Sequence, residues 1–258
     1  SISYCQELNY QVVLYPSTSP DTALEDLKGI VQSRQVGAYI LFEVDMIDHR
    51  VGYLVKEGLP FVMVGRTVDT SGLSYVDADI GQIIKDGVSH LSEVGCRRIA
   101  HLGRKPLVGV DSRIYTALAK ETRERGLILD PSLTLWTSWS PHERLQIVEY
   151  FVNRHREFDA ILISEAAVRF QFVQEALRAG LRIPDDLMVL GYMETHLDEH
   201  AYPSITAFDV QADLMVKTAV EALLDSQESG PRQVLIPGKL NKRDSTRKRN
   251  ASENQHYA

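Results

Sequence analysis

The sequence predicts an α/β protein of two interleaved lobes, each a parallel sheet flanked by helices. Short β-branched or aromatic runs alternate with amphipathic segments, a rhythm typical of right-handed strand–helix–strand crossovers. The length of 258 residues suits two lobes of ordinary domain size, or one large unit. At LSEVGCRRIAHLG, residues 91–103, a helix end runs directly into a buried strand, so we expect the chain to change sheets there. Arg97 and Arg98 at this joint either lie on a hinge surface or only solvate the helix end and interact with its dipole.

Predicted strands are apolar runs short enough to be buried on both faces of a parallel sheet. In chain order they are residues 11–16, 38–42, 60–64, 98–102, 159–163 and 187–191. Each predicted helix begins at a capping or first-turn residue. Asp21 or Thr22 opens the first helix, Asp79 opens a longer one that stops at Gly95, and Pro141 opens a third.

Three predicted crossings divide the chain into its lobes. They lie at residues 95–98, near 203–208 and near 230–237. The N-terminal lobe is then residues 1–96 plus 207–229, and the C-terminal lobe is residues 97–206 plus 230–240. The polar, basic residues 241–258 are predicted to be a disordered tail, a solvated terminus rather than a functional basic arm.

Composition and charge limit the classes of function. A formal net charge of −7 argues against nucleic acid binding by this segment, which would need a clustered basic face. If the protein acts on DNA, another segment does the binding. The longest apolar runs fall far short of the roughly 20 residues that cross a bilayer. Cys5 and Cys96 show neither metal spacing nor a disulfide framework, and no signal pattern opens the chain, so a cytoplasmic location is expected.

Sequence motifs for catalysis are absent. There is no phosphate-binding GxxxxGK[ST], no GxGxxG after a strand, no GxSxG and no HExxH, so we expect neither an enzyme nor a bound cofactor. His196 and His200 are four residues apart near a possible helix, but they lack an obvious third ligand. We therefore expect both histidines to face solvent rather than bind a metal.

Several motifs in one order carry a resemblance to a known family. The run YVDADIGQIIKDGVSHLSEVGCRRIAHLG, residues 75–103, is followed by RAGLRIPDDLMVLGY at 178–192 and PSITAF at 203–208, and is preceded by GLPFVMVGR at 58–66. Together they resemble the effector-binding core of the lac repressor and galactose repressor (LacI/GalR) family. The resemblance covers the chain from Tyr10 to Pro237.

The resemblance implies the body of a transcriptional regulator with a periplasmic-binding-protein-like type I fold. Such a body binds a small effector, often a sugar, and forms a homodimer, while a helix-turn-helix head, not present here, binds operator DNA. The family's first strand is expected to be missing, because residues 1–13 match the end of the first helix running into the second strand. The alternative is a free-standing solute-binding or sensor protein, and an enzyme on a similar fold is a more distant one.

The resemblance also implies an aromatic residue and an arginine in the effector site. Trp139 matches the family's aromatic position, where a ring can stack on a sugar, although it could instead fill the core of a lobe. Trp136, three residues earlier, is expected in the core. Arg113 is the nearest match to the family's ligand-clamping arginine, whereas an ungapped count places Ile114 there and leaves Arg113 on the surface.

Polar positions after the strands complete the candidate site. The family has Asn-Asp after this strand; here Glu165 falls on the asparagine and Ala166 on the aspartate, so Ser164 and Glu165 are expected to supply the polar contacts. Glu165 could also be only a helix N-terminal acid. Met193 replaces the first of two family acids, which places the usual sugar effector in doubt because hydroxyl contacts would be lost. Asp77 matches the family's strand-ending acid, or is a turn or cap residue.

Overall fold

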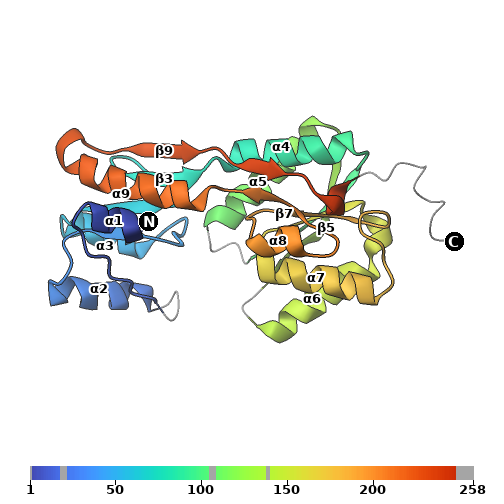
Figure 1. Cartoon of the computed structure of the whole chain (residues 1–258), viewed down its shortest axis with the longest axis horizontal. Helices are drawn as coiled ribbons and strands as arrows, with labels where there is room; N and C mark the ends of the chain where they lie inside the picture. Colours follow the sequence, from blue (N-terminus) through green and yellow to red (C-terminus); the bar gives the residue numbers. More distant parts are fainter. Residues whose placement is uncertain (1, 18–21, 105–108, 138–139, 248–258) are drawn as a thin grey trace. The chain divides into compact units, whose positions relative to one another are not determined.

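The computed structural model describes residues 2–17, 22–104, 109–137 and 140–247 (Figure 1). The chain divides into two compact units that interleave along the sequence. Unit 1 is Ser1–Ala78 with Gln211–Ile236, and unit 2 is Asp79–Val210 with Pro237–Ala258. Each unit has its own mainly parallel sheet with flanking helices, so the predicted α/β class is confirmed.

Unit 1 contains a four-stranded sheet in the order β1-β2-β3-β9, with every pair parallel. Its strands are β1 (Tyr39–Leu41), β2 (Phe61–Val64), β3 (Tyr75–Ala78) and β9 (Gln233–Ile236). Its helices are α1 (Ile2–Glu7), α2 (Ala23–Ser33), α3 (His49–Lys56) and α9 (Ala212–Ser229). Leu27 of α2 and Leu54 of α3 pack with Leu41 and Met63 in a buried apolar cluster. These helices therefore bury their apolar sides against the sheet.

Unit 2 contains a six-stranded sheet in the order β10-β8-β7-β6-β4-β5, parallel except for β10 against β8. Its strands are β4 (Arg98–Arg104), β5 (Ile128–Thr137), β6 (Ala160–Ile163), β7 (Met188–Gly191), β8 (Thr206–Asp209) and β10 (Lys239–Asn241). Its helices are α4 (Ile80–Glu93), α5 (Gly109–Glu124), α6 (Pro141–Asn153), α7 (Ala166–Arg178) and α8 (His196–His200), with 3₁₀ turns η1 (His155–Glu157) and η2 (Asp244–Thr246).

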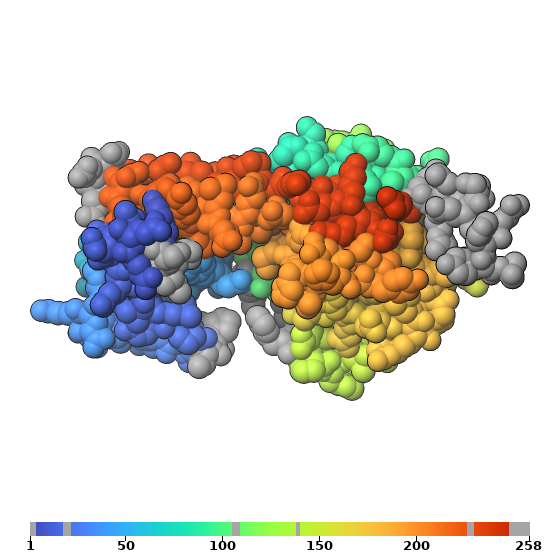
Figure 2. Space-filling view, in the orientation of Figure 1, coloured from blue at the N-terminus to red at the C-terminus, as the bar shows by residue number. Residues whose placement is uncertain are grey.

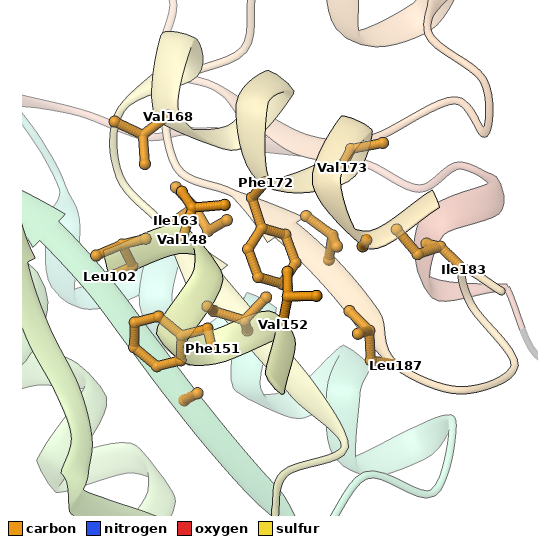
Figure 3. Close-up of a cluster of buried hydrophobic side chains, with 14 of the residues drawn as sticks. Leu102, Val148, Phe151, Val152, Ile163, Val168, Phe172, Val173, Ile183 and Leu187 are labelled. Atoms are coloured by element: carbon orange, nitrogen blue, oxygen red, sulfur yellow. The ribbon is translucent and has the colours of Figure 1, made fainter. Parts of the chain in front are cut away.

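The core of unit 2 lies between its central strands and the helices α6 and α7. Leu102 of β4 and Ile163 of β6 pack with Phe151 of α6 and Phe172 of α7, and all four side chains are almost fully buried (Figure 3). The central strands are therefore covered by apolar contacts on this face, as their continuous apolar sequences predict.

Local sequence explains where two of the predicted helices begin. The Asp79 side chain accepts a hydrogen bond from the Gln82 amide at 3.1 Å and caps α4. Ser140 caps α6 in the same way, with Pro141 in the first turn. Gly95 follows α4 with a φ of +96°, a conformation that glycine adopts without a side-chain clash. The predicted start of α4, the predicted start of α6 and the glycine stop are confirmed.

The boundaries of the units differ from those predicted. The division falls after Ala78 rather than after residue 96, because α4 packs against α5 and β10 of unit 2. Strand β9 pairs with β3, so residues 230–236 belong to unit 1 and not to the second lobe.

The joint at Arg97 and Arg98 therefore lies inside unit 2 and is no crossing. Both backbone amides donate to the Asp159 carboxylate, at 2.7 and 2.8 Å. Asp159 is the residue just before β6, so these two bonds fix the start of β4 beside the start of β6. Helix α4 can therefore pass into β4 without a longer loop.

Two other predicted segments also differ. Residues 11–16 form no strand, since their backbone is paired with no neighbouring strand and their side chains are exposed. The predicted tail is ordered up to residue 247: β10 pairs with β8, and Ser245 and Thr246 in η2 are fully buried. In red in Figure 2, the segment 239–247 lies along the surface of unit 2. Residues 248–258 lie outside the described residues.

Candidate functional site

The carboxyl edge of the unit 2 sheet brings together three of the six predicted site residues. Ser164 and Glu165 follow β6, Met193 follows β7, and Arg104 ends β4. Because parallel crossovers start every following helix at the same edge, α5, α6 and α7 begin there as well. Ligands of open α/β sheets bind beyond the carboxyl ends of the strands, so this edge is the candidate binding site in unit 2.

A buried polar cluster lies beneath this edge. The Ser164 hydroxyl is 3.5 Å from Nε2 of His101 and also hydrogen-bonds the Asp111 carboxylate. Arg104 donates to Asp111 twice, from its amide and from its Nε, both at 3.1 Å. Asp111 is fully buried, and burial raises the pKa of its carboxyl although Arg104 opposes the shift. Ser164 is thus held by partners from β4 and α5 rather than facing open solvent.

His101 is the residue in this cluster that the sequence analysis did not single out. It is fully buried on β4, with Trp136 edge-on at 5.2 Å and Tyr115 stacked at 6.2 Å between ring centroids. Burial lowers the pKa of His101 to about 4, so the ring is neutral near pH 7. Since Ser164 donates its proton to Asp111, Nε2 of His101 must be the donor and Nδ1 the acceptor, and Nδ1 has no partner among the described residues.

Glu165 forms an ion pair rather than a helix cap. It precedes the first residue of α7 but makes no side-chain capping hydrogen bond. Its Oε1 lies 3.5 Å from a terminal nitrogen of Arg144, in the first turn of α6, and both side chains are about one quarter exposed. Glu165 and Arg144 therefore lie at the open side of the edge, in contrast to the enclosed His101 and Asp111.

Met193 is fixed through its backbone by a buried arginine. Arg169 of α7 is fully buried and binds Asp198 of α8 through two bonds, at 2.9 and 2.7 Å. It also donates to the Met193 carbonyl at 3.1 Å and to the Ile163 carbonyl at 3.4 Å. The Met193 side chain itself is about half exposed.

Gly191 makes this arrangement possible. A Cβ atom at that position would lie 2.7 Å from the guanidinium carbon of Arg169. Arg169 can therefore join the ends of β6 and β7 only because β7 ends in a glycine, which has no side chain to clash with the guanidinium.

The remaining predicted site residues have different surroundings. Arg113 lies partly buried on α5, and the neighbouring Ile114 is fully buried. Asp77 belongs to unit 1, where it is the last residue but one of β3, pairs with Arg66 at 3.2 Å and accepts a bond from the Ala78 amide. Trp139 lies outside the described residues.

Two features of the described residues concern metal ions and membrane-spanning helices. No group of histidine, cysteine and acidic side chains there could hold a metal ion, and His196 and His200 are exposed. Within the same residues, no helix combines the length and apolar character needed to cross a bilayer.

Comparison with known proteins identifies the class. Residues 88–246 match the family model described as a periplasmic binding protein-like domain. The chain therefore belongs to the family of periplasmic binding protein-like domains. Within that family it resembles the effector-binding cores of LacI/GalR regulators, as the sequence motifs predict.

Its relatives are named as regulators rather than enzymes. The HTH-type transcriptional regulator CelR of Thermobifida fusca is 24% identical over 204 residues, covering 78% of this chain and 60% of CelR. The chain thus spans less than two thirds of that relative. The HTH-type transcriptional regulator GalR of Streptococcus thermophilus is 21% identical, covering 93% of this chain and 72% of GalR. A solved CelR–cellobiose complex has a TM-score of 0.83 at 24% identity, covering 93% of this chain and 75% of that one.

Proposed function

We propose that this chain is the effector-binding and dimerisation core of a LacI/GalR-type transcriptional regulator. The observation that carries the proposal is the family match over residues 88–246 together with relatives that are named as regulators. DNA binding belongs to a segment outside these residues, since a net charge of −7 disfavours binding to a phosphate backbone. A cytoplasmic location and a homodimer are parts of the same proposal.

The effector is a sugar or a sugar derivative that binds at the carboxyl edge of unit 2. CelR was solved with cellobiose, and the fold is shared over almost the whole of this chain. Ser164, Glu165, Arg113 and Met193 are the proposed contacts in unit 2. Trp139, which lies outside the described residues, is a further proposed contact. Asp77 is the corresponding candidate in unit 1. A ligand that binds one conformation more tightly than another shifts the population of the DNA-binding state.

A thermal-shift series with cellobiose and related sugars tests the effector. A ligand at about 100 times its dissociation constant adds roughly 2.7 kcal/mol to the free energy of unfolding. Glu165→Ala should abolish the response, while Glu175→Ala, at an equally exposed acid farther along α7, should retain it. Conversion of any stabilising ligand into a product would instead support an enzyme.

Operator binding by the longer gene product distinguishes the regulator from a free-standing sensor. We expect specific DNA binding that the effector alters, and sedimentation as a dimer with a total interface of about 1,000 Å² or more. A longer gene product that binds the sugar but no DNA would favour the solute-binding alternative.

A further inference from the structure

Carboxylates at the carboxyl edge of unit 2 are already engaged by arginines. A neutral sugar bound by hydroxyl groups needs acceptors of this kind. The pairs, each between side chains of unit 2, are Asp111 with Arg104, Asp198 with Arg169, Glu194 with Arg243, and Glu165 with Arg144. Glu194 also accepts a hydrogen bond from the Asn241 amide. A hydroxyl-bearing ligand would therefore have to share each of these carboxylates with an arginine that already binds it.

Arg144 is the least satisfied of these arginines. Arg104 and Arg169 each make bonds of 3.1 Å or shorter, whereas the bond from Arg144 to Glu165 is 3.5 Å long, at the limit for a hydrogen bond. The Nε of Arg144 is buried and has no hydrogen-bond partner among the described residues. A guanidinium offers five donors in a planar fork, and among the described residues the Arg144 side chain makes only the long bond to Glu165.

The surroundings of Arg144 favour an anion over a neutral acceptor. Arg144 lies in the first turn of α6, and Glu165 directly precedes α7, so the positive ends of two helix dipoles meet at this pair. Its side chain remains about one fifth exposed, which gives a ligand access. Since Glu165 is similarly exposed, it can turn away when another anion takes the guanidinium.

We propose that the effector carries an anionic group, a phosphate ester or a carboxylate, and that Arg144 binds this group as a bidentate partner. The inference rests on the proposed function, because it names the ligand class of the same site. The anion replaces Glu165 on the guanidinium, and the released Glu165 carboxylate accepts a hydroxyl of the ligand. The guanidinium of an arginine can form two parallel hydrogen bonds with either a phosphate or a carboxylate, so an experiment must distinguish these two ligand groups.

Probes that share one ring and differ in charge test the proposal. Glucose, glucose 6-phosphate and glucuronate would be titrated into the whole chain by calorimetry, together with the pairs ribose and ribose 5-phosphate, and cellobiose and cellobiose 6′-phosphate. We expect a charged member to bind at least about tenfold more tightly than its neutral parent. The preference for phosphate over glucuronate, or the reverse, identifies which anion the site takes.

Variants assign the preference to Arg144. Arg144→Gln should reduce affinity for the charged member by about ten- to a hundredfold and leave the neutral member unchanged. Glu165→Gln removes the competing charge but, unlike Glu165→Ala, keeps a side-chain oxygen that can accept the ligand hydroxyl, so it should bind the charged member at least as tightly as the parent protein. Arg156→Gln, an exposed arginine just before β6 at the other end of that strand, is the matched control and should change neither affinity. Unchanged melting temperatures of the free variants show that each one folds.

The outcomes separate this inference from the proposed function. If a neutral parent sugar binds as tightly as its charged derivative or more tightly, the inference of an anionic effector is wrong, while the proposal of a sugar-responsive regulator still stands. An anionic preference that survives Arg144→Gln would overturn the role of that residue. No response to any charged probe, inorganic phosphate included, would overturn the proposal, while operator binding by the longer gene product would still report on the regulator.

Discussion

Unit 1 and unit 2 are both built from alternating strands and helices, but unit 2 buries ionisable side chains whereas unit 1 exposes an apolar segment. Unit 2 encloses ionisable groups inside its core, among them Arg169, Asp198 and His101, all fully buried. Unit 1 leaves the apolar segment Tyr10–Tyr15 on its surface, with Leu14 82% exposed. The difference shows that an apolar run becomes a buried strand only where a neighbouring strand accepts its backbone, and that polar groups can be buried where partners surround them.

The largest expected effect is on the buried ion pair of unit 2. Arg169→Ala leaves Asp198 as an uncompensated buried charge and should lower the free energy of unfolding by about 3 to 5 kcal/mol. Urea denaturation followed by circular dichroism measures this loss. Arg178→Ala, in an exposed pair with Glu175 on the same helix, is the control and should have little effect. A small loss for Arg169→Ala would show that unit 2 does not depend on its buried charges.

Acid should weaken unit 2 through His101. Its pKa is about 4 in the folded protein and near 6.5 in the unfolded chain, so the unfolded state binds more protons between these values. Stability is therefore complete above pH 6.5 and falls by about 3 kcal/mol as the pH drops to 4. Denaturation at a series of pH values measures the slope. His101→Leu should flatten it over this window; an unchanged slope would mean that other groups cause the acid sensitivity.

The C-terminal segment of unit 2 gives a smaller effect. Thr246 lies 2.7 Å from Nε2 of His90 and 2.7 Å from the Thr206 hydroxyl, so it joins η2 to α4 and β8. Thr246→Val removes the hydroxyl that Nε2 of His90 contacts and one of the hydrogen bonds of Thr206, which keeps its bonds to the Arg243 backbone. The change should cost about 1 to 3 kcal/mol, measured by thermal unfolding. Thr116→Val, at an exposed position of α5, provides the comparison. If the two variants lose the same stability, residues 239–247 are not anchored as described.

The smallest effect is expected in unit 1. Leu14→Ser removes an apolar side chain that is already exposed, so the free energy of unfolding should change by no more than about 0.5 kcal/mol. Guanidinium denaturation would detect a change in the free energy of unfolding larger than this. A loss above about 2 kcal/mol would indicate a buried strand and would remove the contrast between the two units.

Sequence periodicity predicted the elements whose signals are local. Strands β4, β6 and β7 are continuous apolar runs, and α4 and α6 begin at side chains that cap them. Strand β5 was missed because Ile128–Thr137 contains polar residues and a proline. The boundary of the units was misplaced because a helix between two sheets has the same pattern whichever sheet it covers.

The candidate site was predictable only in part for the same reason. Ser164 and Glu165 follow a recognisable strand. Their partners Asp111 and Arg144 lie far away in the sequence, and no helical or strand repeat indicates that they are close in space. A signal for Arg169 was available: it occupies the buried face of α7 with Phe172, Val173 and Ala176, where an arginine requires a buried counter-charge. His101 gave a similar signal as a polar residue within an apolar strand.

The exposed segment of unit 1 also bears on how the protein can be stored. Tyr10–Tyr15 reads Tyr-Gln-Val-Val-Leu-Tyr, a hexapeptide without charge or proline whose residues favour extended structure. Such segments stack into cross-β fibrils when they meet in register. Because this one is displayed by the folded chain, fibril nucleation does not have to wait for global unfolding. Shelf life should therefore fall as concentration rises, even under conditions where the fold is fully stable.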